Sequence, residues 1–409
     1  MFDESYFSKG LLIKSLADSW KVTVKVLRLS HSNKLWGTPD VKCAQISNLT
    51  GRATGSDSGR PTMLIANLFV APPIVGPKST ERGMKHGRKS KHNFKVSASE
   101  FPAFLPSEVE KITDPFARKL ASRIERLPVH LSLAKTCIMS SCVKPKAQLD
   151  TSPLVLLHGF DSSCLEWRYT LPLLEEAGLE TWAVDVLGWG FSDLEKLPSC
   201  SVASKRDHLY QFWESYIKRP MTLVGPSLGA AVAIDFVIKY PEAVDKLILI
   251  DASVYAEGTG NLAKLPKLVA YAGVYLLKSL PLRLYATSLT FNSLAWTTCL
   301  DWANIGRLHC LLPWWEDATV DFMISGGYNV SADIKQVKQK TLIIWGEDDQ
   351  IIDNKLAVRL HCELPNAIIR QIPDCGHIPH VEKPAAVSKL ITEFVQAECK
   401  IATPTFILS

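Results

Sequence analysis

Short apolar runs separated by helical stretches constrain this fold more than any other feature of the sequence. Each run is nearly continuous, which is typical of a strand buried on both faces of a parallel sheet. Helical patterns fill the intervals near 163–177, 203–219 and 228–240. This alternation predicts an α/β fold, with a mostly parallel central sheet and helices on both faces. The runs are Leu154–Leu157, Trp182–Val184, Thr222–Val224, Leu247–Ile250 and Leu342–Trp345.

Residues suited to binding or catalysis follow these runs directly. In an open parallel sheet, ligands bind at the carboxyl ends of the strands. We therefore expect one site at that edge of the sheet. The residues placed there are His158, Gly159, Phe160, Asp185, Ser227, Asp251 and Asp349.

Ser227 stands between the third apolar run and a helical pattern rich in Ala, Val and Ile. Gly225 and Gly229 flank it at two residues on either side. This is the strand–turn–helix form of a nucleophile elbow. The small flanking residues let strand and helix approach closely, and the helix N-terminus stabilises negative charge near the hydroxyl. We predict that Ser227 is a nucleophile.

A base and an acid follow in an order that fits this nucleophile. His377 lies on a loop after a short predicted strand, Ile368–Ile372, and Asp349 follows the run that ends at Trp345. His377 would take the proton of Ser227, and Asp349 would orient the imidazole and stabilise its charged form. The chain order is serine, aspartate, histidine, which differs from that of chymotrypsin and subtilisin.

Three neighbours are alternatives for these roles. Asp348 precedes Asp349, so the acid could be shifted by one residue. Asp251 ends the preceding run and is a second candidate acid, or a cap for the next segment together with Ser253. His380 has a much weaker claim than His377 as the base.

An oxyanion hole requires two backbone N–H donors. The residue after the nucleophile, Leu228, supplies one, and the loop after the first run supplies the other, for which Phe160 is the best candidate. Pro226 lacks an N–H, but it is not one of the two donors.

The interval between Asp251 and Thr341 breaks the alternation, because about 90 residues there carry no strand pattern. We predict a helical cap over 255–334, inserted between the core segments 151–254 and 335–409. Most of its aromatic residues are expected to pack, and the others to line an apolar substrate pocket. The predicted substrate contacts are His158, Gly159, Trp314 and Trp315.

Residues 1–98 differ in charge from the rest of the chain. They hold 16 Lys/Arg and 6 Asp/Glu, and Glu81 is the only acid in 63–98. An acid-poor, Arg/Lys-rich leader predicts a transit peptide, and Val96–Ala98 resembles a plastid processing site. The predicted location is the chloroplast, in the stroma or at a membrane. The alternatives are a start at Met63 and a basic tail that stays on the mature protein.

The segment 99–150 is expected to hold a helical extension, Pro106–Leu127, and the first strands. Ser107 can cap this helix, and Pro115 is expected to split it into two.

The 311 residues after the leader hold 30 Lys/Arg and 35 Asp/Glu, which argues against a nucleic-acid surface. The ten cysteines lack C-x-x-C and zinc spacing and predict free thiols, so we expect no metal. Because no apolar stretch reaches about 18 residues, we predict no transmembrane helix.

Residues 150–397 resemble the α/β-hydrolase superfamily, in particular its cap-bearing esterases, lipases and C–C hydrolases. The resemblance implies that Ser227 is the nucleophile, Asp349 the acid and His377 the base. With its leader, the chain looks like a plant plastid-targeted member. Pro226 departs from the family, which usually has His, Tyr, Asn or Gln there. The matching segments are Leu157–Phe160, Asp185–Asp193, the elbow at Ser227, Trp345–Asp349, Gly376-His377 and Glu382–Pro384.

These features predict a serine hydrolase that cleaves an ester-like bond in a hydrophobic small molecule or lipid, such as a phytyl-type ester, without a cofactor. The alternatives are a ligand-binding or receptor protein on the same fold, a C–C bond hydrolase and an acyltransferase. Peripheral membrane contact through the cap or the 107–127 helix is compatible with each of them. The sequence predicts no oligomeric state.

Overall fold

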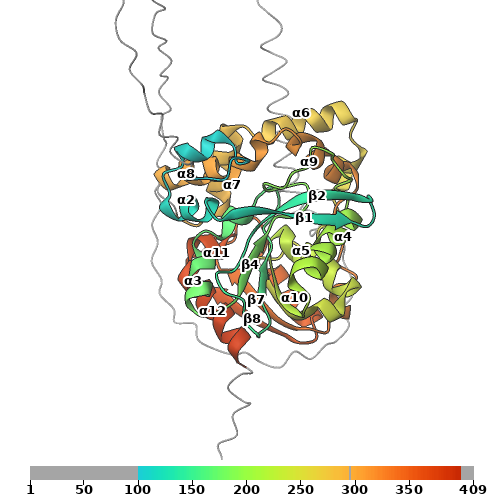
Figure 1. Cartoon of the computed structure of the whole chain (residues 1–409). Helices are drawn as coiled ribbons and strands as arrows, with labels where there is room; N and C mark the ends of the chain where they lie inside the picture. The colour runs from blue at the N-terminus through green and yellow to red at the C-terminus, as the bar shows by residue number, and fades with distance from the viewer. Residues whose placement is uncertain (1–99, 294–295, 398–409) are drawn as a thin grey trace, which may run out of the picture. The chain divides into compact units, whose positions relative to one another are not determined.

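The computed structural model describes residues 100–293 and 296–397 (Figure 1). Its centre is an eight-stranded sheet in the order β1-β2-β4-β3-β5-β6-β7-β8. β1 pairs antiparallel with β2, and β2 with β4, whereas the remaining pairs are parallel. The predicted α/β fold is confirmed, and the predicted leader, 1–98, lies outside the described residues. The strands are β1 (Ile124–Leu131), β2 (Thr136–Val143), β3 (Leu154–Leu156), β4 (Thr181–Val184), β5 (Met221–Pro226), β6 (Val244–Ile250), β7 (Lys340–Gly346) and β8 (Ala367–Ile372).

Helices cover both faces of the sheet. Figure 1 shows α3 and α12 on one face and α4 and α5 on the other. The core helices are α2 (Pro115–Ala121), α3 (Thr170–Glu176), α4 (Val202–Phe212), α5 (Leu228–Lys239), α10 (Lys355–Glu363), α11 (Pro379–Glu382) and α12 (Pro384–Gln396). The shorter turns of helix outside the cap are η1 (Ser107–Lys111), η2 (Cys164–Trp167), η3 (Trp213–Ile217), η4 (Pro241–Ala243) and η7 (Ile334–Gln336).

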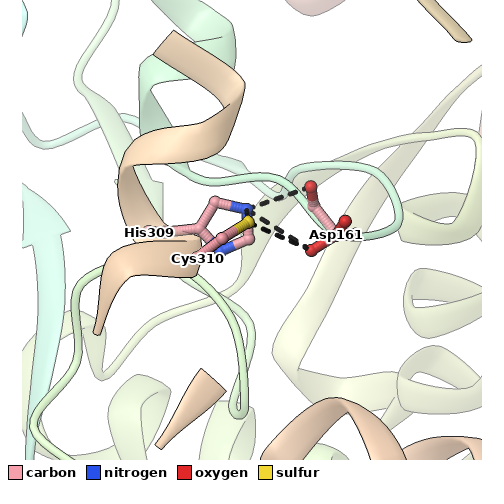
Figure 2. Close-up of side chains that lie close together, drawn as sticks. All are labelled: Asp161, His309 and Cys310. Carbon is pink, nitrogen blue, oxygen red and sulfur yellow. Dashed lines mark hydrogen bonds and ion pairs between the residues drawn. The ribbon is translucent and has the colours of Figure 1, made fainter. Parts of the chain in front are cut away.

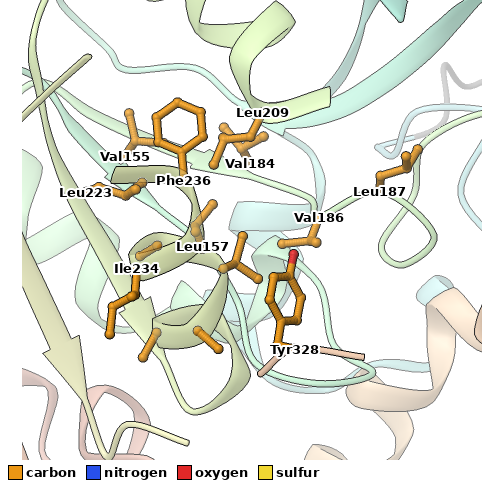
Figure 3. Close-up of a cluster of buried hydrophobic side chains, with 14 of the residues drawn as sticks. Val155, Leu157, Val184, Val186, Leu187, Leu209, Leu223, Ile234, Phe236 and Tyr328 are labelled. Atoms are coloured by element: carbon orange, nitrogen blue, oxygen red, sulfur yellow. The ribbon is translucent and has the colours of Figure 1, made fainter. Parts of the chain in front are cut away.

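Alternate residues of each central strand enter two different cores. Val155 and Leu223 point toward α4 and α5, where they pack with Phe236 (Figure 3). Leu154 and Val224, one residue away along the same strands, pack on the opposite face beneath α3 and α12. Because successive side chains of a strand face opposite ways, burial on both faces requires the continuous apolar runs seen in the sequence.

The interval between β6 and β7 is helical, and its helices lie within the segment predicted as a cap, 255–334. Its helices are η5 (Gly260–Lys264), α6 (Lys267–Leu277), α7 (Leu280–Thr290), α8 (Trp296–Arg307), η6 (Leu308–Leu311) and α9 (Trp315–Ile324). α7 packs on α8, and α6 packs on α9.

The helix predicted over Pro106–Leu127 is wrong in extent. η1 ends at Lys111, α2 begins at Pro115, and the chain enters β1 at Ile124. Asp114 caps α2 by accepting hydrogen bonds from the N–H groups of Phe116 and Ala117, so Pro115 opens a helix rather than splitting one. Ser107 caps no helix, because Pro106 holds the N-cap position of η1.

Within the described ranges, no helix combines the length and the apolar character needed to cross a bilayer.

Candidate active site

Ser227 lies at the turn between β5 and α5 with φ 48° and ψ −118°. This positive φ is strained for a residue with a side chain, at about 1–3 kcal/mol. The N–H of Ser227 donates to the Ile250 carbonyl at 2.8 Å, which ties the turn to β6. A Cβ on Gly225 would lie 2.2 Å from the Gly229 carbonyl oxygen, so strand and helix can cross this closely only without side chains at these positions. The predicted elbow is therefore present.

The structure brings Ser227, His377 and Asp349 into one line of hydrogen bonds. The Nε2 atom of His377 lies 2.9 Å from the Ser227 Oγ atom, and its Nδ1 atom lies 2.8 Å from Asp349 Oδ2. The second oxygen of Asp349 accepts from the N–H groups of Ile351 and Ile352 at 2.7 and 3.0 Å. Burial raises the pKa of Asp349, but His377 and these two donors outweigh it, so that the pKa lies below its ordinary value. These contacts place Asp349 where an anion could orient the imidazole, as predicted for the acid.

Asp348, the alternative acid, points elsewhere. It accepts a hydrogen bond from the Asn292 side chain at 2.8 Å.

Asp251, the other alternative, is fully buried beside Asp349. Its Oδ1 atom accepts the Gly346 N–H at 2.9 Å, and the described residues offer no partner to its Oδ2 atom. Burial, followed by the charge of Asp349, raises the pKa of Asp251 well above its ordinary value. This direction favours the neutral form of Asp251, and Asp349 is the carboxylate that contacts the imidazole.

The two predicted oxyanion donors lie on the chain segments beside Ser227. Leu228 is the first residue of α5, and its N–H has no carbonyl of its own helix to bond. Across 100–293 and 296–397, no acceptor is found for the Phe160 N–H. Gly159 lies beside Ser227, because a Cβ there would be 3.6 Å from the Ser227 Cβ atom. Both N–H groups are available for an oxyanion.

Buried polar side chains fix the loop that carries Phe160. The Gly159 N–H donates to Glu166 at 3.1 Å, and Glu166 also pairs with His380 at 2.7 Å. Burial raises the pKa of Glu166, but His380 outweighs this effect and brings the pKa to about 2. The Nε2 atom of His158 accepts the Val186 N–H at 3.0 Å, and its Nδ1 atom donates to the Gly159 carbonyl at 2.8 Å. The loop is thus held before Phe160.

Asp161 holds the same loop after Phe160 and links it to the cap. Its backbone has φ 51°, and its carboxylate pairs with Arg283 of α7 at 2.5 Å and accepts the Trp315 indole N–H at 2.8 Å. Figure 2 shows His309 and Cys310 of η6 closing around this carboxylate. Arg283 also donates to Cys310 at 2.8 Å. The position of Phe160 is therefore coupled to three segments of the cap.

Two clusters combine ligand types that metals use, but most of their atoms have other partners. Asp161 is paired with the Arg283 guanidinium, and burial raises the pKa of the Cys310 thiol well above its ordinary value. Around Asp251, the atoms of Asp349 and His377 are engaged in the hydrogen bonds to the serine and to backbone. Neither donor set fits a cation.

Two predicted substrate contacts have a different role. Both ring nitrogens of His158 bond to backbone, and Trp315 is buried with its N–H on Asp161. These contacts assign both side chains to the packing that supports the loop. Trp314 is half-buried, with Arg126 above its ring at 5.9 Å. Asp185, which also follows a strand, accepts the N–H groups of Cys164 and Phe191 and ties loops together.

Glu166 and Arg283 support the loop from η2 and α7, and neither was predicted from the sequence. The one available signal for Glu166 was an acidic residue between apolar neighbours, in Cys164–Trp167. Arg283 lies 122 positions from Asp161, and no local pattern connects them.

The fold, the elbow and the Ser227–His377–Asp349 geometry define an α/β hydrolase. Residues 152–384 match the family described as alpha/beta hydrolase fold, and the chain belongs to this family.

The chain is 63% identical over 301 residues to alpha/beta hydrolase domain-containing protein VTE7 of Arabidopsis thaliana, covering 73% of this chain and 91% of that protein. It is 25% identical over 252 residues to human monoacylglycerol lipase ABHD6, covering 59% of this chain and 74% of the lipase. A thermophilic esterase from Thermogutta terrifontis superposes with a TM-score of 0.56 at 18% identity, covering 67% of this chain and 98% of the esterase, which supports the fold alone. The relatives named as hydrolases place this chain in a hydrolase family.

Proposed function

We propose that this protein is a serine hydrolase that cleaves an ester-like bond in a hydrophobic small molecule or lipid. One observation carries the proposal. The Ser227 hydroxyl, the His377 ring and the Asp349 carboxylate are joined by hydrogen bonds of 2.9 and 2.8 Å, beside two unengaged backbone N–H groups. A nucleophile, a base, an orienting acid and an oxyanion hole are the parts that acyl transfer requires.

The reaction begins when the Ser227 oxygen attacks the ester carbonyl and its proton passes to the Nε2 atom of His377. The carbonyl oxygen becomes an oxyanion and accepts hydrogen bonds from the N–H groups of Leu228 and Phe160. Collapse of this intermediate breaks the ester C–O bond, and His377 protonates the departing alcohol. The acyl group is now on Ser227.

Water completes the cycle. His377 takes a proton from the water as it attacks the acyl carbon, and the acid product leaves when Ser227 regains its proton. Asp349 stays ionised throughout and stabilises the imidazolium, which its low pKa favours.

The composition of the cap is an argument for a hydrophobic substrate. It is rich in Leu, Tyr and Trp, and α7 holds both the Asp161 and the His377 loops. A lipase among the relatives agrees with this substrate class.

A fluorophosphonate probe tests the proposed nucleophile. We expect the folded wild-type protein to be labelled on Ser227 and the Ser227→Ala variant not to be labelled, with both giving the same circular dichroism spectrum. Hydrolysis of p-nitrophenyl esters of short to long acyl chains should fall by about 10⁴-fold or more in this variant. If a reference serine hydrolase is labelled and the folded wild type is not, a ligand-binding protein on this fold is the better description.

We also propose that the protein acts in the plastid, on the basis of the basic leader. Mass spectrometry of the protein isolated from plastids would identify its N-terminus, which we expect near Ser99. A protein that retains residues 1–98 would contradict the transit peptide.

A further inference from the structure

The outward face of α6 is apolar, which is unusual for a helix on a protein surface. Leu268 is 82% exposed and Tyr275 is 61% exposed, and Tyr271 and Ala272 are exposed between them. These positions are spaced i, i+3, i+4 and i+7, so they share one side of the helix.

The opposite side of α6 carries smaller residues. Ala270 and Val274 are buried against the cap, where α6 packs on α9. A helix that only stabilises a cap directs its large apolar side chains inward and its small or polar ones outward. α6 departs from this arrangement, because Leu277 packs inward with Ala270 and Val274 but Leu268 and Tyr275 point away from the protein.

α6 and the segments before and after it in the sequence carry positive charges alone. Between Glu257 and Asp301 the sequence holds Lys264, Lys267, Lys278 and Arg283 and no carboxylate. Exposed Lys264 and Lys267 lie where α6 begins, and Lys278 follows its last residue.

Two carboxylates approach α6 from α9, and both are engaged. Glu316 pairs with Lys278, and Asp317 accepts the Tyr271 hydroxyl at 2.7 Å. The Lys278 ammonium also lies 4.8 Å from the centre of the Tyr275 ring. The face therefore presents leucine and tyrosine side chains with lysines at its ends.

We propose that the α6 face docks the protein on a bilayer that contains anionic lipid. Tyrosine prefers the interface between hydrocarbon and water, and lysine reaches from it to the lipid phosphates. An amphipathic helix of this kind lies in the plane of the interface and inserts its apolar side. Figure 1 shows α6 at the outer edge of the cap, away from α10 and α12.

Charge complementarity favours a bilayer over a second copy of this chain. In a two-fold contact between two α6 faces, Lys264 and Lys267 would find no carboxylate in 258–300, and the nearby Glu316 and Asp317 are already engaged with Lys278 and Tyr271. An anionic lipid surface pairs with the same lysines. Docking by this face also brings the cap, which contacts the loops of Asp161 and His377, to the source of a lipid substrate.

Flotation of the full chain with phosphatidylcholine vesicles, with and without phosphatidylglycerol, tests the proposal at physiological salt. We expect wild type to float with the anionic vesicles. The bound fraction of the double variant Leu268→Glu/Tyr275→Glu should be lower by at least about tenfold, because the two apolar side chains that would move from water into the bilayer are absent. The matched control Leu133→Glu/Val358→Glu makes the same charge change at positions that are 62% and 60% exposed, and should bind like wild type.

Hydrogen exchange separates docking by α6 from attraction of the basic leader. Vesicles should slow amide exchange in α6 and leave α10 unchanged. Both double variants should match wild type in circular dichroism and in turnover of a soluble ester. Unchanged exchange in α6, or equal flotation of the two double variants, overturns the proposal. The proposal is also overturned if size-exclusion chromatography finds that the wild type is a dimer and that the double variant Leu268→Glu/Tyr275→Glu is a monomer.

Discussion

The Arg283–Asp161 pair offers the sharpest test of how cap and core are joined. Replacement of Arg283 by methionine keeps most of the side-chain volume and removes the charge. The Asp161 carboxylate then stays buried with the Trp315 N–H as its remaining strong donor. The side chains of Arg283 and Asp161 are only 13% and 8% exposed, so water can replace little of the lost interaction.

We expect Arg283→Met to lower the free energy of unfolding by about 3–5 kcal/mol, the usual effect of leaving one buried partner unpaired. The double variant Arg283→Met/Asp161→Asn should recover most of this loss, because the introduced amide is neutral and can still accept the Trp315 N–H. Urea unfolding of the full chain, followed by tryptophan fluorescence, measures the midpoint and the slope for each variant.

The loss should also depend on pH. Burial already raises the pKa of Asp161 above its ordinary value, and removal of the Arg283 charge raises it further. A carboxyl group with a raised folded pKa contributes stability that falls as pH rises above about 4, its unfolded value. The deficit of Arg283→Met should therefore be smaller at pH 5 than at pH 8.

Two outcomes would refute this account of the pair. One is a loss of less than about 1 kcal/mol in Arg283→Met, which is the range of an exposed ion pair. The other is a loss in the free energy of unfolding of the double variant that exceeds the sum of the losses of the two single variants. If Arg283→Met does not fold, Arg283→Lys keeps the charge without the paired geometry and should be intermediate in stability.

Three further predictions concern the groups around Ser227. Asp349→Asn should lower kcat for ester hydrolysis by about 10⁴-fold while circular dichroism stays unchanged, and a loss of less than tenfold would argue against its role. Asp251→Asn should keep most of the activity and be at least as stable as wild type at pH 8. The reason is that a carboxyl group with a raised folded pKa destabilises the fold once the pH exceeds its unfolded pKa. Inactivation as complete as in Asp349→Asn would instead make Asp251 the acid. Glu166→Gln should lower the free energy of unfolding by about 1.5–3 kcal/mol at pH 7. Its difference from wild type in urea unfolding should shrink as pH falls from about 4.5 toward 2, because the stability that the lowered pKa of Glu166 contributes is lost across that range. A difference that stays constant with pH would contradict an ionised Glu166.

The central strands were predictable because each carries its own signal. A strand buried on both faces is apolar throughout, so Leu247–Ile250 and Leu342–Trp345 mark β6 and β7 without tertiary information. β1 carries no such signal. Its Arg126 and Pro128 resemble the end of a helix, and Ile124–Leu131 becomes a strand through its pairing with β2.

The candidate site divides in the same way. Ser227 and His377 are 150 positions apart and meet because each follows a strand of the same parallel sheet. The support of the loop that carries Phe160 could not be foreseen, because Asp161 meets Arg283 only through the path of the cap. Trp315 was misassigned for the same reason, since a tryptophan that packs and one that lines a pocket look alike in sequence.

The attachment of the His377 loop to the cap has a consequence for protein engineering. The His377 N–H donates to the Thr290 carbonyl at 2.7 Å, and a Cβ on Gly376 would lie 2.4 Å from that oxygen. The cap therefore cannot be removed as an independent unit, since a truncation that joins β6 directly to β7 would also remove the backbone that positions His377. A chimera that exchanges substrate preference should keep the end of α7 through Asn292 and replace segments on either side of it.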